Sequence, residues 1–181
     1  LVGVLIRSFY LKTSARLLKA LYILVEDECA KAILTEIIRR VDSDFMQSVG
    51  IFPAGDADTI AKTVRAVKTT GLSVAAVRDG DKNPTPSDNI YKLPGALPPE
   101  KELFASLAVR DHLRSVYNLD LNDFQTNLQG VDHHEWIGRL AERVMQDKSA
   151  LAAEMARSYA RSLPETETSS LVTLLKEATR R

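Results

Sequence analysis

The segment VRDGDKN, residues 77–83, places two carboxylates one residue apart just after an apolar run. That run, residues 72–77, contains a single polar residue and is typical of a buried β-strand. Residues i and i+2 of an extended backbone project to the same side, so we expect Asp79 and Asp81 to point together. Two like charges held this close are costly unless a cation offsets them, and carboxylate oxygens suit Mg²⁺ or Mn²⁺. The segment therefore predicts a metal site at the carboxyl end of a strand.

A similar change from apolar to acidic residues occurs earlier in the chain. Residues 21–25, LYILV, predict a buried parallel strand, and Glu26, Asp27 and Glu28 follow it at once. The segments between these two points alternate between helix and strand, with the expected boundaries 29–41, 49–55 and 59–70.

The order strand, helix, strand, helix, strand predicts an α/β fold with a parallel sheet and right-handed crossovers. Functional groups of such sheets gather beyond the carboxyl ends of the strands. We therefore expect Glu26 to lie beside Asp79 and Asp81 although the strands that carry them are far apart in the sequence.

The chain changes character after Asn83. Residues 83–99 hold five of the seven prolines, which predicts a loop, with one short strand at 90–93. Helical periodicity dominates from residue 100 onward, with expected helices over 100–116, 120–128, 132–147, 149–162 and 167–180. We expect three parts: a linker or tail of a preceding domain (1–20), the catalytic core (21–95) and a helical extension that completes it (96–181).

Composition is that of an ordinary globular protein. The 181 residues are 45% hydrophobic, and 24 basic side chains balance 24 acidic ones, so a DNA partner would need a local basic patch. A single cysteine, Cys29, excludes an internal disulfide and a multi-cysteine zinc site, and it fits a reducing, cytoplasmic setting. No apolar run reaches the length of a membrane span, so we expect no membrane partner.

Three of these segments resemble the TOPRIM fold, which topoisomerases, primases and overcoming-lysogenisation-defect (OLD) nucleases share. They are VEDE after the first strand, GIFPAGDAD at the second and DGD after the third. The family pattern of a Glu followed by an Asp-x-Asp matches Glu26, Asp79 and Asp81, and DGDKN is closest to the OLD-type branch. The resemblance covers residues 20–95. It implies a Rossmann-like parallel sheet with flanking helices and a DNA endonuclease that uses one or two Mg²⁺ or Mn²⁺ ions to activate water.

The resemblance also implies partners. OLD-type nuclease domains follow an ATPase domain in the same chain, form homo-oligomers and include anti-phage defence proteins. The sequence contains no GxxxxGK[ST] loop, so any ATPase activity would come from outside it.

Further site residues follow from the same resemblance. OLD-type enzymes draw a later acidic ligand from beyond the Asp-x-Asp strand, and Glu102 is preferred here over Glu100. Both glutamates also suit a helix N-terminus. A distal lysine that offsets charge on the phosphate is matched by Lys148, for which a solvated residue at a helix boundary is the alternative.

Two positions depart from the OLD-type pattern. Many members carry Gly directly after the first Glu, where this chain has Asp27, and a second acid one helical turn later, where it has Ala30. Asp27 or Glu28 would have to substitute at a different spacing.

Three more residues are candidates for supporting roles. His133 and His134 can contact phosphate or transfer protons, or they simply begin a helix that carries a packed Trp136. Lys82 can touch phosphate or offset the charge of the aspartates beside it.

Two other functions remain open at the level of sequence. LYILVEDE also resembles the start of a response-regulator receiver, in which Asp79 would accept a phosphoryl group. A receiver needs two further strands and a Lys-Pro pair, which we do not find. The third alternative, a TOPRIM-like module that binds DNA or assembles without cleaving, rests on Ala30.

Overall fold

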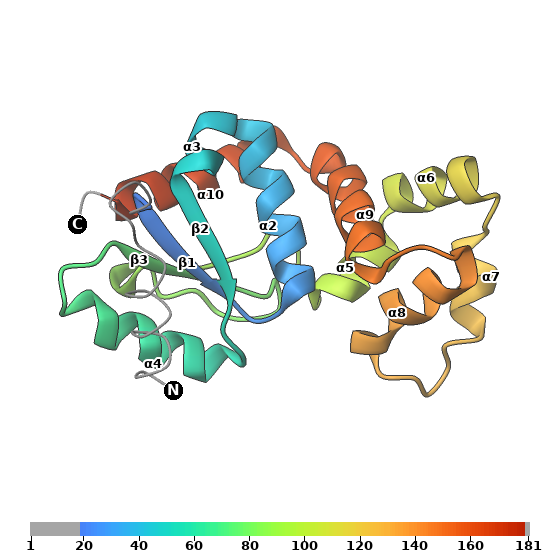
Figure 1. The fold of residues 1–181 in the computed structure, drawn as a ribbon, viewed down its shortest axis with the longest axis horizontal. Coiled ribbons are helices and arrows are strands. Elements are labelled where there is room, and N and C mark those ends of the chain that lie inside the picture. Colours follow the sequence, from blue (N-terminus) through green and yellow to red (C-terminus); the bar gives the residue numbers. More distant parts are fainter. Residues whose placement is uncertain (1–18, 180–181) are drawn as a thin grey trace.

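A four-stranded, fully parallel sheet forms the centre of the fold (Figure 1). The computed structural model describes residues 19–179, so residues 1–18 of the predicted linker at 1–20 lie outside them. The strands lie in the order β2-β1-β3-β4, with the bounds β1 Leu21–Val25, β2 Val49–Pro53, β3 Val74–Arg78 and β4 Ile90–Lys92. The predicted α/β parallel sheet is confirmed, and its helix-flanked form is Rossmann-like.

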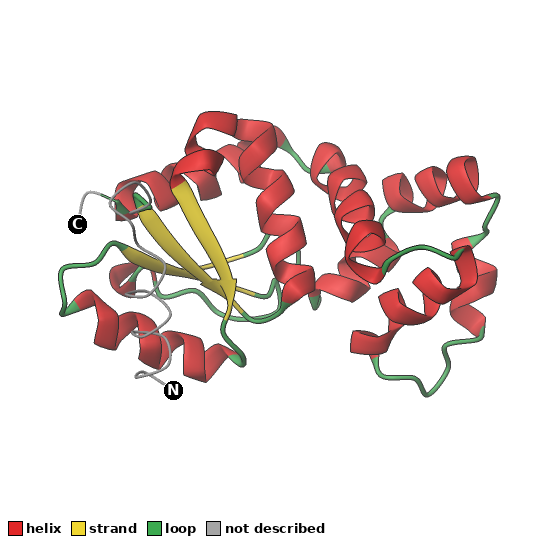
Figure 2. Ribbon diagram, in the orientation of Figure 1, coloured by secondary structure: helices red, strands yellow, loops and turns green. Residues whose placement is uncertain are grey.

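Helices cover both faces of this sheet (Figures 1 and 2). Helices α2 (Glu28–Val41) and α10 (Glu165–Ala178) pack on one face, and α4 (Ala57–Lys68) packs on the other. The chain moves one way from β1 to β2 and the opposite way from β2 to β3. Right-handed crossovers in opposite directions place their helices on opposite faces, which explains the three layers.

Strand β1 is buried on both sides. Its alternate residues Leu21, Ile23 and Val25 belong to the core under α2, whereas Leu24 packs with Ile60 of α4. A continuous apolar run is the expected sequence of such a doubly covered central strand.

Five further helices form a part that lies beside the sheet: α5 Pro99–Ala105, α6 Leu107–Tyr117, α7 Leu121–Thr126, α8 His133–Val144 and α9 Lys148–Ser162. Helix α9 packs along α2 and α5 touches the start of α2, so α2 joins this part to the sheet. Helix α10 then returns to the sheet and contacts α2 and β3. None of the helices within residues 19–179 is both long and apolar enough to cross a membrane.

Two features of the helices differ from the sequence prediction. The helix expected over 100–116 is interrupted at Ser106, which has an extended conformation and separates α5 from α6. Helix α2 ends at Val41 as expected, but the short helix α3 (Ser43–Ser48), which was not predicted, follows at once. Asp42 ends α2 and also caps α3, since its Oδ1 accepts a hydrogen bond from the N–H of Phe45 at 2.8 Å.

Met145 ends α8 in the left-handed conformation with φ 54° and is 90% exposed. This conformation costs a residue with a Cβ about 1 kcal/mol. We expect Met145→Gly to raise the free energy of unfolding by about that amount in a urea titration. Met145→Ala keeps the Cβ and serves as the control. Equal stability of the Gly and Ala variants would contradict the left-handed conformation of Met145.

Candidate metal centre

Glu26 and Asp79 meet at the carboxyl ends of the two central strands. Glu26 follows β1 and Asp79 follows β3, and these strands are neighbours. Oε1 of Glu26 accepts a hydrogen bond from the backbone N–H of Asp79 at 3.1 Å. The chain leaves β1 toward β2 on one side and returns to β3 on the other, which makes this the switch point where open α/β sheets bind ligands. We call Glu26 and Asp79 the carboxylate centre.

Asp79 is 6% exposed, and within residues 19–179 its Oδ1 has no hydrogen-bond partner. Burial raises the pKa of Asp79 to about 8. Four carboxylates raise this pKa further: Glu26, Asp27, Asp81 and Glu100. Burial also raises the pKa of Glu26, although the N–H of Asp79 opposes this. Crowded carboxylates with a buried, unpartnered oxygen fit a hard divalent cation such as Mg²⁺ or Mn²⁺.

Residues 79–82 form a turn rather than an extended continuation of β3. The N–H of Lys82 donates to the carbonyl of Asp79 at 3.1 Å, which closes a four-residue turn. Asp81 is exposed and pairs with Lys82 at 2.8 Å. The prediction that Asp79 and Asp81 project together from an extended backbone is wrong for this reason. The charge of Asp81 nevertheless raises the pKa of both Asp79 and Glu26.

The two glutamates of α5 are placed differently. Glu100 is 4% exposed, and its Oε1 lies 3.5 Å from Nδ1 of His134. Glu102 turns away, and its Oε1 accepts hydrogen bonds from the N–H groups of Ala96 at 2.7 Å and Leu97 at 2.9 Å. The preference for Glu102 as the later metal ligand therefore does not fit its placement. Glu100 is the glutamate whose charge reaches the carboxylate centre.

Glu102 instead supports the turn after β3. The loop 95–97 that it holds passes so close to Gly80 that a Cβ there would lie 3.0 Å from the carbonyl carbon of Gly95. Lys92 Nζ also donates to the carbonyl oxygens of Gly80 at 3.0 Å and Gly95 at 3.2 Å. The glycine between the two aspartates is thus required by a close backbone approach.

The first turn of α2 contributes one carboxylate to the site. Ala30 is buried, and its N–H donates to Oδ1 of the capping Asp27 at 2.8 Å. Asp27 raises the pKa of both members of the carboxylate centre. The side chain of Glu28 is mostly exposed. Of the two proposed substitutes for the missing acid at Ala30, Asp27 is the one that acts on the centre.

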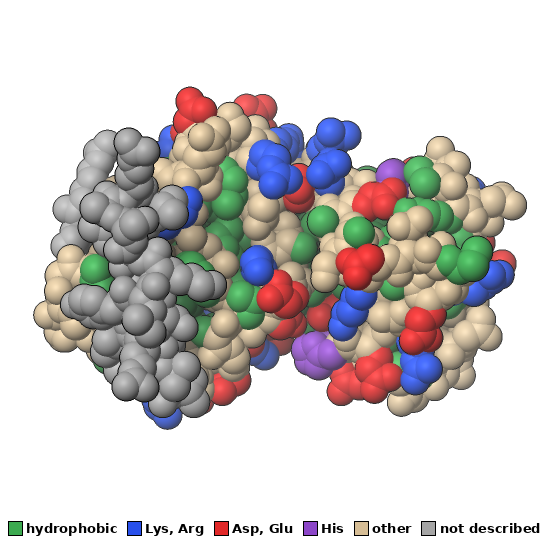
Figure 3. Space-filling model, in the orientation of Figure 1, with side chains coloured by type: hydrophobic (Ala, Val, Ile, Leu, Met, Phe, Trp, Pro, Cys, Tyr) green, Lys and Arg blue, Asp and Glu red, His purple; other side chains and the backbone are tan. Residues whose placement is uncertain are grey.

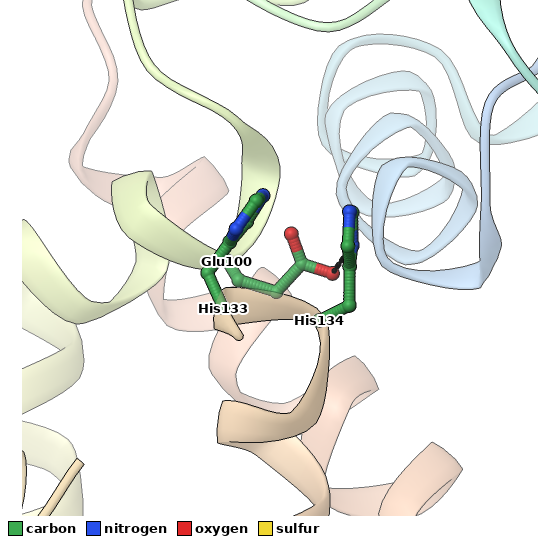
Figure 4. Close-up of side chains that lie close together, drawn as sticks. All are labelled: Glu100, His133 and His134. Carbon is green, nitrogen blue, oxygen red and sulfur yellow. Dashed lines mark ion pairs between the residues drawn. The ribbon is translucent and has the colours of Figure 1, made fainter. Parts of the chain in front are cut away.

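His133 and His134 form the first two positions of α8. Trp136 on the next turn packs against Phe104 of α5 with ring centroids 5.2 Å apart, so the helix start does carry a packed tryptophan. A carboxylate oxygen of Glu100 and one ring nitrogen each of His133 and His134 all lie within 4.8 Å of one another (Figure 4). This group can hold a metal ion. Glu100 is buried, His133 is partly buried and His134 is exposed.

A cleft of about 990 Å³ opens beside the carboxylate centre and is walled by α2, α8 and α9. Its acidic end contains Glu26, Asp79 and Glu100, with His134 and Lys148 nearby on its wall. Further cations line the same cleft: Lys31, Arg39 and Arg157. Figure 3 shows acidic side chains and a histidine together where the sheet-bearing part meets the helical part, with basic side chains gathered above them. The cleft thus combines a negative end with a partly basic wall.

Sequence reasoning did not identify Glu36 or Arg157 in this wall. Glu36 is buried and pairs with Arg39 on its own helix and with Arg157 of α9, whose Nε lies 3.4 Å from Oε2 of Glu36. The three-residue spacing of Glu36 and Arg39, which allows an ion pair on one helix, can be read from the sequence. The approach of Arg157 depends on how α9 docks on α2, which the spacing does not reveal.

We expect the metal-free protein to lose stability as pH rises from 6 to 8. The pKa of Asp79 is about 8 in the folded protein and near 3.8 in the unfolded chain. Between these values the folded state holds a proton that the unfolded state has released, so stability falls as pH rises. The variant Asp79→Asn cannot bind or release this proton. Its free energy of unfolding should therefore fall less between pH 6 and 8 than that of wild type, by up to about 2 kcal/mol.

Urea unfolding in EDTA at the two pH values measures this difference. The exposed Asp123 provides the control variant Asp123→Asn, which should behave as wild type. An equal decrease in the free energy of unfolding of wild type and Asp79→Asn between the two pH values would contradict the burial of a protonated Asp79.

We also expect Glu102→Ala to lower the free energy of unfolding by about 1–2 kcal/mol, because two backbone N–H groups lose their acceptor. Glu102→Gln retains Oε1 as an acceptor and should lose less. Both values come from urea titrations at one pH. A Glu102→Ala protein as stable as wild type would show that the loop 95–97 does not depend on this carboxylate.

Comparison of the chain with models of protein families, with curated proteins and with solved structures found no match. The functional argument therefore depends on the geometry and chemistry of the residues described above.

Proposed function

We propose that this chain is a TOPRIM-type, metal-dependent DNA nuclease whose carboxylate centre hydrolyses phosphodiester bonds. One observation carries the proposal: Glu26 and Asp79 meet at the switch point of the sheet, and a buried carboxylate oxygen of Asp79 has no partner among the described residues. This is the position at which α/β sheets bind ligands, and oxygen donors of this kind suit Mg²⁺ or Mn²⁺.

The role of each residue follows from its surroundings. Glu26 and Asp79 would hold the cation, and Asp81 adds negative charge from the exposed side of the turn. A bound Mg²⁺ or Mn²⁺ would lower the pKa of a water molecule and offset the charge of the phosphate. The hydrogen bond from the Asp79 N–H keeps the Glu26 carboxylate oriented toward its partner.

The basic side chains of the cleft supply contacts for the nucleic acid. Lys148 at the start of α9 lines the cleft that the carboxylate centre borders, and it would bind the phosphate next to the scissile bond. Lys31, Arg39 and Arg157 would bind neighbouring phosphates, which are held mainly by charge. An ATPase domain in a longer parent chain, homo-oligomerisation and a defence role belong to the proposal through the resemblance to OLD-type proteins alone.

The two alternatives have less support. Within residues 19–179 a single short strand, β4, follows β3, whereas a receiver needs two. Lys92 at the end of β4 donates to the carbonyls of Gly80 and Gly95 rather than to Asp79. A module without catalysis rests on Ala30, but Asp27 and Glu100 bring carboxylate charge to the same place.

Nicking of supercoiled plasmid with Mg²⁺ or Mn²⁺ tests the proposal. We expect metal-dependent nicking by wild type and a loss of about 100-fold or more in Asp79→Asn and Glu26→Gln, because each removes a metal ligand. Asp123→Asn should nick as wild type does. Absence of metal-dependent nicking, or equal nicking by Asp79→Asn, would overturn the proposal. Labelling of Asp79 by a phosphoryl donor would favour the receiver.

A further inference from the structure

We propose that Glu100, His133 and His134 form a second metal site, distinct from the carboxylate centre, that binds a transition-metal ion of the Zn²⁺ type. The site is defined by one carboxylate oxygen and two imidazole nitrogens within 4.8 Å of one another. In Figure 4 the carboxylate of Glu100 lies between the two imidazole rings. This inference depends on the geometry of these three residues and stands whether or not the chain cleaves DNA.

The elements that carry the three residues are held firmly together. Glu100 lies in the first turn of α5, and α5 packs on α8 through the contact between Phe104 and Trp136. Trp136 is itself fixed, since its Nε1 donates to the carbonyl of Val131 at 3.0 Å. Packing of both helices therefore sets the backbone positions of the three residues before any ion binds.

The ion pair with His134 accounts for only one of the two oxygens of Glu100. The 3.5 Å between its Oε1 and Nδ1 of His134 is longer than a good hydrogen bond. Its Oε2 has no hydrogen-bond partner within residues 19–179, although the residue is 4% exposed. Burying a carboxylate oxygen without a partner is costly, and an adjacent cation removes that cost.

The distances between the ligand atoms suit a metal ion with short metal–ligand bonds. Ligands about 2.0–2.1 Å from a tetrahedral Zn²⁺ lie roughly 3.4 Å apart. At 3.5 Å, the pair formed by Glu100 and His134 already has about this separation, and one ligand atom from each of the three residues lies within 4.8 Å of the others. The two imidazole rings lie with centroids 4.1 Å apart.

The chemistry of the donor atoms also favours a metal of this kind. Imidazole nitrogens together with a carboxylate select Zn²⁺ and related ions over Mg²⁺, which prefers oxygen alone.

The N-terminus of α8 carries a partial positive charge that opposes a cation. Two further carboxylates offset it. Oδ1 of Asp132 lies 3.4 Å from Nδ1 of His133, and Oδ2 of Asp27 lies 3.7 Å from Nδ1 of His134. Asp27 also raises the pKa of both members of the carboxylate centre, so it couples the two sites by charge.

Titration of the untagged full chain with Co²⁺, a coloured substitute for Zn²⁺, tests the site, with Zn²⁺ displacing the cobalt. We expect a visible absorption band for one ion and a loss of affinity of about 100-fold in His133→Ala and His134→Ala. The third histidine of the chain provides the matched control. His112 lies on α6 and pairs with Glu154, so His112→Ala should bind as wild type does.

The same titration separates this inference from the proposed nuclease. Asp79→Asn should retain the cobalt band, because Asp79 is not a ligand of the second metal site. Glu100→Gln should weaken the cobalt band. Because Glu100 is buried, this variant can be unstable, and the variant at the exposed His134 then provides the test. Zn²⁺ binding that is unchanged in both His133→Ala and His134→Ala, or lost in Asp79→Asn alone, would overturn the inference.

Discussion

The hydrogen bond from the N–H of Asp79 to the carboxylate of Glu26 joins the ends of the two central strands. It places the partly buried Glu26 beside the buried Asp79, where like charges repel and, within residues 19–179, one oxygen of Asp79 has no partner. The surrounding structure is built to hold this costly arrangement. Gly80 allows the loop 95–97 to approach the turn, and Glu102 fixes that loop through its backbone.

The helical part adds a second group of polar side chains to the same edge of the sheet. Helix α9 docks on α2 and brings Lys148 and Arg157 to the cleft, while α5 and α8 bring Glu100 and His134 to it. The cleft consequently joins the carboxylate centre, part of the nitrogen and oxygen group formed by Glu100, His133 and His134, and a partly basic wall. Such a combination suits the binding of a phosphate backbone next to one or more metal ions.

Sequence patterns predicted the parallel α/β sheet and the meeting of Glu26 with Asp79, because buried strands and the acids that follow them are local features. The turn after β3 was not predicted, since a segment with a central glycine is compatible with both an extended and a turned backbone. The preference for Glu102 over Glu100 also does not fit the placement of the two side chains. Residues two apart on a helix face different directions, and only the docking of α5 decides which one is directed at the site.

Calorimetric titration with Mn²⁺ at pH 7, repeated in buffers of different ionisation enthalpy, tests the central claim most directly. The claim is that Glu26 and Asp79 hold a divalent cation. Because the pKa of Asp79 is about 8, wild type should bind Mn²⁺ with release of about one proton. Asp79→Asn should lose both the binding and the proton release. Equal Mn²⁺ binding by Asp79→Asn, or binding without proton release, would contradict the account.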